Sequence, residues 1–174
     1  MKQYTNGYVS NRVLKLNVGF VLSAGPSYAH ETSFDVPPVR VSDDVDLSYI
    51  RGDLRLSRTK EGVLVQGELH VGLEGECYRC LDPIAQDLTI TIEELYTYPA
   101  SVAGEFSIGE DAILDLAPLV RAEALIADTW GGLCKPDCKG LCPECGANLN
   151  HESNHAHEAE IDPRMAKLKQ LLDR

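Results

Sequence analysis

The chain has 174 residues, of which 44% are hydrophobic and only 6% aromatic, and its formal charge at pH 7 is −11. This length predicts one domain of ordinary size, with a core built mainly from Val, Leu and Ile. The acidic balance opposes non-specific adhesion to nucleic acid, because such binding depends on clustered cations. A local basic patch or a basic protein partner remains compatible with it.

The N-terminal residues 1–7 hold no apolar core of the kind that a secretory signal needs. The apolar run 13–22 is interrupted by Lys15 and Asn17 and is too short to span a bilayer. The sequence therefore predicts a cytoplasmic protein with no membrane partner. Thiols stay reduced in that compartment, so the six cysteines favour metal binding over disulfides.

Residues 1–100 predict a β-rich part. Apolar and polar residues alternate over 14–22, which predicts a half-buried strand, and the Ser-, Gly- and Pro-rich residues 23–38 predict a loop. A second alternation over 45–56 changes phase, which indicates a bulge near Gly52, and residues 59–62 predict a hairpin turn. Clear alternation over 63–74 and 88–93 then places Cys77 and Cys80 at the tip of a hairpin.

The second half of the chain changes character. A helix is predicted within 110–130, capped by Asp115, with Leu116, Val120, Ala124 and Ala127 on its apolar side. A Cys/His segment follows over 131–160, and Pro163 opens a terminal helix over 161–174. We therefore expect a single domain over 1–174 of the α+β class: an antiparallel, β-rich meander or partly closed sheet with a few helices and a zinc-ribbon-like C-terminal segment.

The spacing of the cysteines is typical of metal ligation. Cys77 and Cys80 form one C-x-x-C turn, and four more cysteines lie within residues 134–145. In a C-x-x-C turn both thiolates can point at one ion, and an all-thiolate tetrahedral site favours zinc. Six incidental thiols are the alternative interpretation. Thioredoxin-like redox chemistry is disfavoured, because neither turn lies in a parallel βαβ unit.

Two arrangements of ligands are compatible with this spacing. The preferred one joins the two C-x-x-C turns in a single site, formed by Cys77, Cys80, Cys142 and Cys145. The other closes a site locally from Cys134, Cys138, Cys142 and Cys145. The first arrangement frees two cysteines for a second ion, which would be held by Cys134, Cys138, His155 and His157, with His151 as a substitute. Alternatively, the three histidines are simply solvated.

A catalytic role for the metal is not indicated. The sequence has no H-E-x-x-H helix, no G-x-S-x-G elbow and no phosphate-binding glycine loop, and all-thiolate sites are usually closed. His155, His157 and Glu158 leave a hydrolase as a minor alternative. The locally basic window contains Arg51, Arg55, Arg58 and Lys60. These cations could contact nucleic-acid phosphates if the bulge brings them onto one face; otherwise they make up a charged strand edge that discourages aggregation.

The sequence resembles the YceD family of bacteria and plastids. The resemblance lies in the segments 14–20, 54–59, 61–67, 77–83 and 93–95, in the signature 133–150, and in the terminal segment 161–172. It implies a role in the accumulation of large-subunit ribosomal RNA. Some members lack the downstream cysteines, and many carry a C-x-C before the terminal helix, where this chain has His155 and His157.

The sequence thus predicts a non-enzymatic, zinc-binding factor in ribosome biogenesis. Its expected partner is large-subunit rRNA or a basic large-subunit ribosomal protein, and no small-molecule substrate is expected. Two alternatives remain open: a zinc-thiolate redox sensor, in which oxidation ejects the metal, and a metal-dependent nuclease acting on rRNA precursors.

Overall fold

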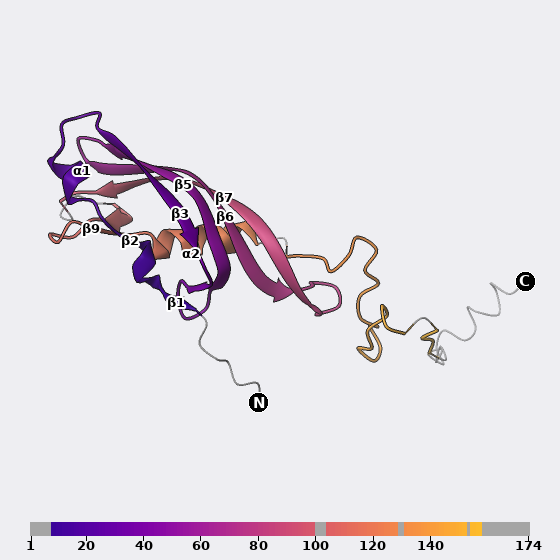
Figure 1. The fold of residues 1–174 in the computed structure, drawn as a ribbon. Helices are drawn as coiled ribbons and strands as arrows, with labels where there is room; N and C mark the ends of the chain where they lie inside the picture. The colour runs from indigo at the N-terminus through magenta and orange to yellow at the C-terminus, as the bar shows by residue number, and fades with distance from the viewer. Residues whose placement is uncertain (1–7, 100–103, 129–130, 153, 158–174) are drawn as a thin grey trace, which may run out of the picture.

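The computed structural model describes residues 8–99, 104–128, 131–152 and 154–157 (Figure 1). Strands dominate this part of the chain. In order, the elements are β1 (Val9–Ser10), the 3-10 helix η1 (Asn11–Leu14), β2 (Lys15–Asn17), α1 (Gly19–Ser23), β3 (Ala29–Val36), β4 (Val39–Arg40), β5 (Asp46–Arg58), β6 (Gly62–Glu76), β7 (Pro83–Thr97), β8 (Phe106–Ser107), β9 (Ile113–Asp115) and α2 (Ala117–Ala127).

The described strands form a seven-stranded mixed sheet and a separate two-stranded one. The four long strands run antiparallel in the order β3-β5-β6-β7, and β5, β6 and β7 follow one another as a meander. The short strands β1 and β8 instead pair in parallel with β4 and β7. The predicted antiparallel meander is therefore right for the long strands and wrong for the sheet as a whole.

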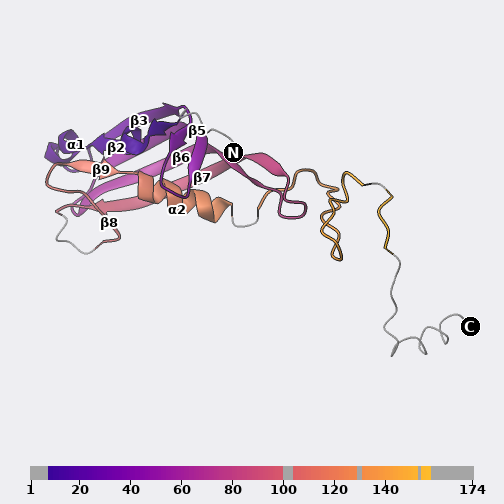
Figure 2. The ribbon, with the colours of Figure 1, turned by 90° about the horizontal axis from the view of Figure 1, so that it is seen from below.

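The core lies on one face of this curled sheet. The long strands contribute a row of almost fully buried side chains, namely Ile50, Leu54, Leu56, Val63, Val65, Leu69, Val71, Ile90 and Ile92. Helix α2 packs Leu119, Val120 and Ala124 against the same core and runs beneath β7 (Figure 2). Burial of each such aliphatic side chain contributes roughly 1.5–3 kcal/mol. The other face of the four strands is open and polar.

Two predictions in the N-terminal third are wrong. The expected strand over 14–22 breaks at Asn17, whose side chain accepts a hydrogen bond from the Gly19 backbone N–H and opens α1. The expected loop over 23–38 contains strand β3 instead. Only Phe34 and Val36 of that strand are buried, because it lies at the edge of the sheet, and so its sequence lacks the apolar alternation that would have revealed it.

The predicted bulge lies elsewhere. The register shift in β5 falls between Leu47 and Tyr49 rather than near Gly52. Gly52 has another function: its φ is +142°, and a Cβ at this position would lie 2.3 Å from the Glu68 carbonyl oxygen. The glycine therefore permits close approach of β5 and β6 in an unbroken ladder.

The predicted helix is confirmed but is shorter than expected. It covers Ala117–Ala127, and residues before it form β9, which pairs with β2. Asp115 still stabilises the start of the helix, because its carboxylate accepts a hydrogen bond from the Ala117 N–H at 3.0 Å. The predicted terminal helix over 161–174 lies outside the described residues. No helix within the described residues is long and apolar enough to cross a membrane.

Candidate metal centres

The first candidate centre begins at the tip of the β6–β7 hairpin. Between the two strands the chain makes a tight turn, in which Cys77 N–H donates to the Asp82 carbonyl and Leu81 N–H donates to the Cys77 carbonyl, both at 2.8 Å. Leu81 completes the turn with a positive φ of 61°. As a result Cys77 and Cys80 are both buried and lie on the same side of the turn, as their C-x-x-C spacing predicted.

The C-terminal segment docks onto this tip. Tyr78 N–H donates to the Gly132 carbonyl at 3.2 Å, and Leu141 N–H donates to the Arg79 carbonyl at 3.1 Å. Figure 1 shows the segment continuing past the end of the hairpin, away from the sheet. These two backbone contacts bracket residues 134 and 138 and so decide which cysteines meet the hairpin.

Four sulfur atoms converge there. Cys77 Sγ lies 3.8 Å from Cys138 Sγ, and Cys80 Sγ lies 3.5 Å from Cys134 Sγ. All four sulfurs are within 4.8 Å of one another. Zn–S bonds of about 2.3 Å at tetrahedral angles would place sulfurs about 3.8 Å apart. The spacing of the four thiols therefore fits one tetrahedral ion.

A second cluster forms further along the segment. Cys142 N–H donates to the Ala147 carbonyl and Gly146 N–H to the Cys142 carbonyl, both at 2.8 Å, which closes a second cysteine turn. His157 Nε2 lies 3.2 Å from Cys142 Sγ, and His155 Nε2 lies 3.2 Å from Cys145 Sγ. These four ligand atoms also lie within 4.8 Å of one another.

Both histidines of this cluster have a carboxylate behind them. His155 Nδ1 lies 2.6 Å from Glu152 Oε2, and His157 Nδ1 lies 3.4 Å from Glu144 Oε2. A carboxylate that accepts from Nδ1–H leaves the lone pair on Nε2, the atom that faces the cluster. The two Nε2 atoms are 2.8 Å apart, an arrangement that suits a shared cation.

The structure groups the eight side chains differently from both predicted arrangements. Cys77 and Cys80 meet Cys134 and Cys138, whereas Cys142 and Cys145 meet His155 and His157. The predicted substitute, His151, belongs to neither cluster, since its Nε2 lies 3.5 Å from Asp82 Oδ2. The preferred arrangement was wrong because it paired the two C-x-x-C turns by their likeness, while the path of the chain brings the C-x₃-C pair to the hairpin first.

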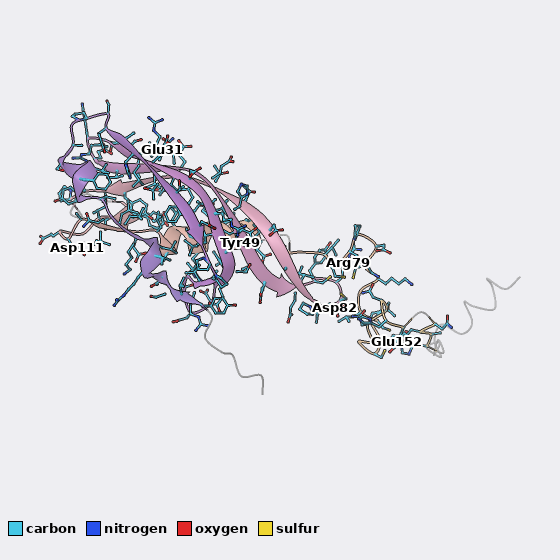
Figure 3. All side chains as sticks on the ribbon, in the orientation of Figure 1. Glu31, Tyr49, Arg79, Asp82, Asp111 and Glu152 are labelled. Carbon is cyan, nitrogen blue, oxygen red and sulfur yellow. The ribbon has the colours of Figure 1, made fainter. Side chains whose placement is uncertain are left out.

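Three polar residues link the thiols of the first cluster to the segment that leads into the second, and sequence reasoning missed them. Asp82 accepts from Cys80 Sγ at 3.3 Å and from Asn148 Nδ2 at 3.0 Å (Asp82 is labelled in Figure 3). Asn150 Nδ2 donates to Cys138 Sγ at 3.3 Å. The segment that leads into the second cluster therefore supports thiols of the first. The sequence signal that could have revealed these residues is the presence of short polar side chains soon after each cysteine turn.

Hydrogen bonds lower the pKa of Cys77 and Cys138 in the first cluster and of Cys142 in the second. Burial favours the neutral form of Cys77, but backbone N–H groups, chiefly that of Cys134, outweigh it and lower its pKa to about 6. The backbone N–H groups of Cys145 and Glu144 lower the pKa of Cys142 to about 6 as well. Burial raises the pKa of Cys80 above the ordinary value of a thiol. Each cluster thus has at least one thiol whose surroundings favour the thiolate, the form that binds a metal.

The four cations proposed for nucleic-acid contact do not form one patch. Arg51 pairs with Asp35 at 3.0 Å, and Arg58 donates to the Gly62 carbonyl at 2.9 Å. The register of β5 and β6 is continuous from residue 49 to 58, so Arg51 and Arg55 point to the open face while Arg58 points to the other. Lys60 lies exposed in the following turn.

Comparison with the sequence models of protein families shows which family the chain belongs to. The sequence model of the family described as "Large ribosomal RNA subunit accumulation protein YceD" matches residues 65–172. The chain belongs to the YceD family. This confirms the resemblance seen in the sequence, and the matched region contains all eight candidate ligands together with most of β6, all of β7 and α2.

Several YceD relatives extend the comparison. An uncharacterized protein of Mycobacterium tuberculosis is 41% identical over 127 residues, which cover 69% of this chain and 60% of the relative. The maize protein named "Large ribosomal RNA subunit accumulation protein YCED homolog 1, chloroplastic" is 29% identical over 67% of this chain and 47% of its own length. Bacillus subtilis YlbN, also uncharacterized, is 25% identical over 79% of this chain and 76% of its own.

The chain thus spans about 60% of the length of the mycobacterial relatives it matches. No solved structure matches it.

Proposed function

We propose that this chain is a non-enzymatic, zinc-binding factor in ribosome biogenesis that supports the accumulation of large-subunit ribosomal RNA. The observation that carries the proposal is membership of the YceD family, whose description names that process. The maize relative bears the same name. Because the mycobacterial relatives are longer than this chain, the proposal covers only the process of rRNA accumulation and assigns no function to their additional segments.

Zinc is the metal that the donors favour. One cluster offers four thiols and the other two thiols and two imidazoles, which are the ligand sets of structural zinc sites. Four ligands complete each tetrahedron and leave no open position for a water nucleophile. The first ion would hold the C-terminal segment against the β6–β7 tip, and the second would close that segment on itself. Both need a reducing compartment such as the cytoplasm, where the thiols stay available.

A structural metal also argues against the nuclease alternative. His155 and His157 would both be engaged as ligands through Nε2, with their Nδ1 atoms facing Glu152 and Glu144. Neither ring would then be free to act as a general base. Glu158, the remaining candidate for that role, lies outside the described residues.

The charge of the chain fits a basic protein partner better than it fits bare RNA. Arg51 is paired with a carboxylate and Arg55 stands between Glu31 and Gln66 in the neighbouring strands, so the open sheet face offers phosphates little uncompensated positive charge. The chain as a whole carries a formal charge of −11, which attracts basic segments such as those of ribosomal proteins.

The proposal is tested in a strain deleted for this gene. Large-subunit and small-subunit rRNA are measured by RNA blot across a sucrose gradient, with the gene restored in trans as the control. Selective loss of large-subunit rRNA that the restored gene reverses is the expected result. Equal amounts of both subunits, in proportions unchanged from the parent strain, would refute it.

One observation favours a second candidate function. Each cluster has one exposed thiol, Cys134 in the first and Cys145 in the second, within reach of a small oxidant. A peroxide could take two electrons from a pair of cluster thiolates, form a disulfide and release zinc, as in a redox sensor. Zinc release at low peroxide, reversed by a thiol reductant, would support this function, and a metal that stays bound would exclude it.

A further inference from the structure

Strand β7 has a long outer edge with no backbone partner among the described residues. Strand β8 pairs with it only at Tyr96 and Thr97. Cys77 N–H bonds to the Asp82 carbonyl at one end of the β6–β7 ladder, and Tyr98 N–H bonds to the Glu61 carbonyl at the other. Because hydrogen-bonded pairs alternate in an antiparallel ladder, the even-numbered residues of β7 bond to β6.

The odd-numbered residues of β7 therefore direct their backbone N–H and C=O groups outward. Five of them lie in the free stretch, and each also has an exposed side chain: Ala85, Asp87, Thr89, Thr91 and Glu93. Natural edges are usually interrupted by lysine, proline or a bulge. Here the only proline is Pro83 at the first position, and the ladder from residue 83 to 97 is continuous. The edge can accept another strand.

The charge beside this edge has one sign. Strands β6 and β7 carry no lysine or arginine and six carboxylates: Glu68, Glu74, Glu76, Asp87, Glu93 and Glu94. The nearest strand with arginines is β5, on the far side of β6 and about 10 Å from β7. Arg51 on that strand is already paired with Asp35.

We propose that an extended, lysine- or arginine-bearing segment of a basic protein adds to the outer edge of β7 as a further strand of the sheet. Main-chain hydrogen bonds to the five outward-facing residues would hold it, and its cations would lie over the carboxylates of β6 and β7. The inference rests on the proposed function, for which it names the surface that receives the partner.

Two other occupants fit the surface less well. A second copy of this chain, paired through its own β7, would bring two acidic faces together. Nucleic acid would bring phosphates to the same carboxylates and has no strand edge to offer. The first metal cluster lies at the tip of the same hairpin, where a bound ion would keep β7 in register with β6 as the partner binds.

The probe for the test is a synthetic nonapeptide of alternating lysine with threonine or valine, added to the zinc-loaded full-length chain. Its control is the same peptide with alternate backbone nitrogens methylated, which keeps the charge and removes the donors on one edge. Affinity is measured by calorimetry, and the binding site is mapped from amide NMR shifts. We expect shifts at residues 85–93 and an affinity about tenfold lower for the methylated peptide, which loses main-chain hydrogen bonds.

Two variants of one residue locate the contact. Thr91→Pro removes an outward N–H without breaking a bond to β6, whereas Thr91→Val keeps that N–H. We expect the peptide to bind the first about tenfold more weakly and the second within about twofold of the wild type, since only the first loses a main-chain donor. Glu68→Gln should weaken binding more at low salt than at high salt.

Several results would overturn the proposal: no binding of the nonapeptide, equal affinity for the methylated peptide, shifts that lie away from β7, or displacement of the peptide by a uridine oligonucleotide. A concentration-dependent dimer abolished by Thr91→Pro would assign the edge to a second copy instead. The methylated peptide keeps the test valid if the proline variant fails to fold. Because the assay contains no ribosome, its outcome is independent of the rRNA measurement that decides the proposed function.

Discussion

Asn150 supports a ligand of the first metal cluster from the segment that leads into the second. Its side-chain Nδ2 donates to Cys138 Sγ at 3.3 Å and to Asn148 Oδ1 at 3.0 Å, and its Oδ1 accepts from the Lys139 N–H at 3.0 Å. The Asn150→Ala variant loses all three bonds. None of the eight candidate ligands changes, so any effect on zinc comes through the support of a ligand.

The size of the effect follows from these partners. Loss of a residue that supports a ligand typically lowers metal affinity about 10- to 100-fold. Lys139 is exposed, so its N–H can bond to water instead, and Asn148 Oδ1 keeps a second donor, the Asn150 backbone N–H at 3.0 Å. The main loss is then the single N–H···S bond to Cys138. We therefore expect about a tenfold reduction, at the lower end of that range.

The assay is a competition titration of zinc between the protein and a fluorescent chelator. The control is Asn154→Ala, which removes an exposed amide that has no hydrogen bond with another described residue. The reduction should appear in the four-cysteine site and leave the Cys/His site nearly unchanged. A zinc affinity of the Asn150→Ala protein equal to that of the Asn154→Ala control would refute the reasoning.

Two further predictions concern the sheet and its packing. Gly52→Ala places a Cβ 2.3 Å from the Glu68 carbonyl and should lower the free energy of unfolding by about 1–3 kcal/mol in urea, whereas Gly25→Ala, with nothing within 4 Å, should not. Asp44 pairs with Arg121 of α2, which holds the pKa of its carboxyl below the ordinary 3.8. A depressed folded-state pKa stabilises the protein above the unfolded value, so Asp44→Asn should lower the melting temperature at pH 7. That difference should begin to shrink as the pH falls below about 4 and should be lost as the pH falls through the depressed folded-state pKa of Asp44; a difference that does not shrink at all below pH 4 would contradict the ion pair.

The hairpin and the residues that gather in the two candidate metal centres could be predicted from the sequence. Val63, Val65 and Leu69 alternate with polar residues, so the period of two revealed β6 and placed Cys77 at its end. All eight candidate ligands lie in one of two clusters, because cysteine turns are local structures whose spacing reports their geometry.

The grouping of the ligands into two clusters and the edge strand β3 could not be predicted from the sequence. The pairing depends on where residues 131–141 meet the hairpin, which two backbone bonds at Gly132 and Leu141 decide. No side-chain pattern encodes such bonds. Strand β3 could not be predicted for a related reason. Its only buried side chains are Phe34 and Val36, and the rest of its stability comes from backbone pairing with β5.

The most direct test of the account is the zinc count of the full-length chain and three variants, read by native mass spectrometry after a chelator wash. The structure places Cys77 and Cys142 in different clusters. The wild type should hold two zinc ions, Cys77→Ser and Cys142→Ser one each, and the double variant none. Had both cysteines served one ion, the double variant would keep the other; a double variant that still holds one zinc would contradict the two centres described here.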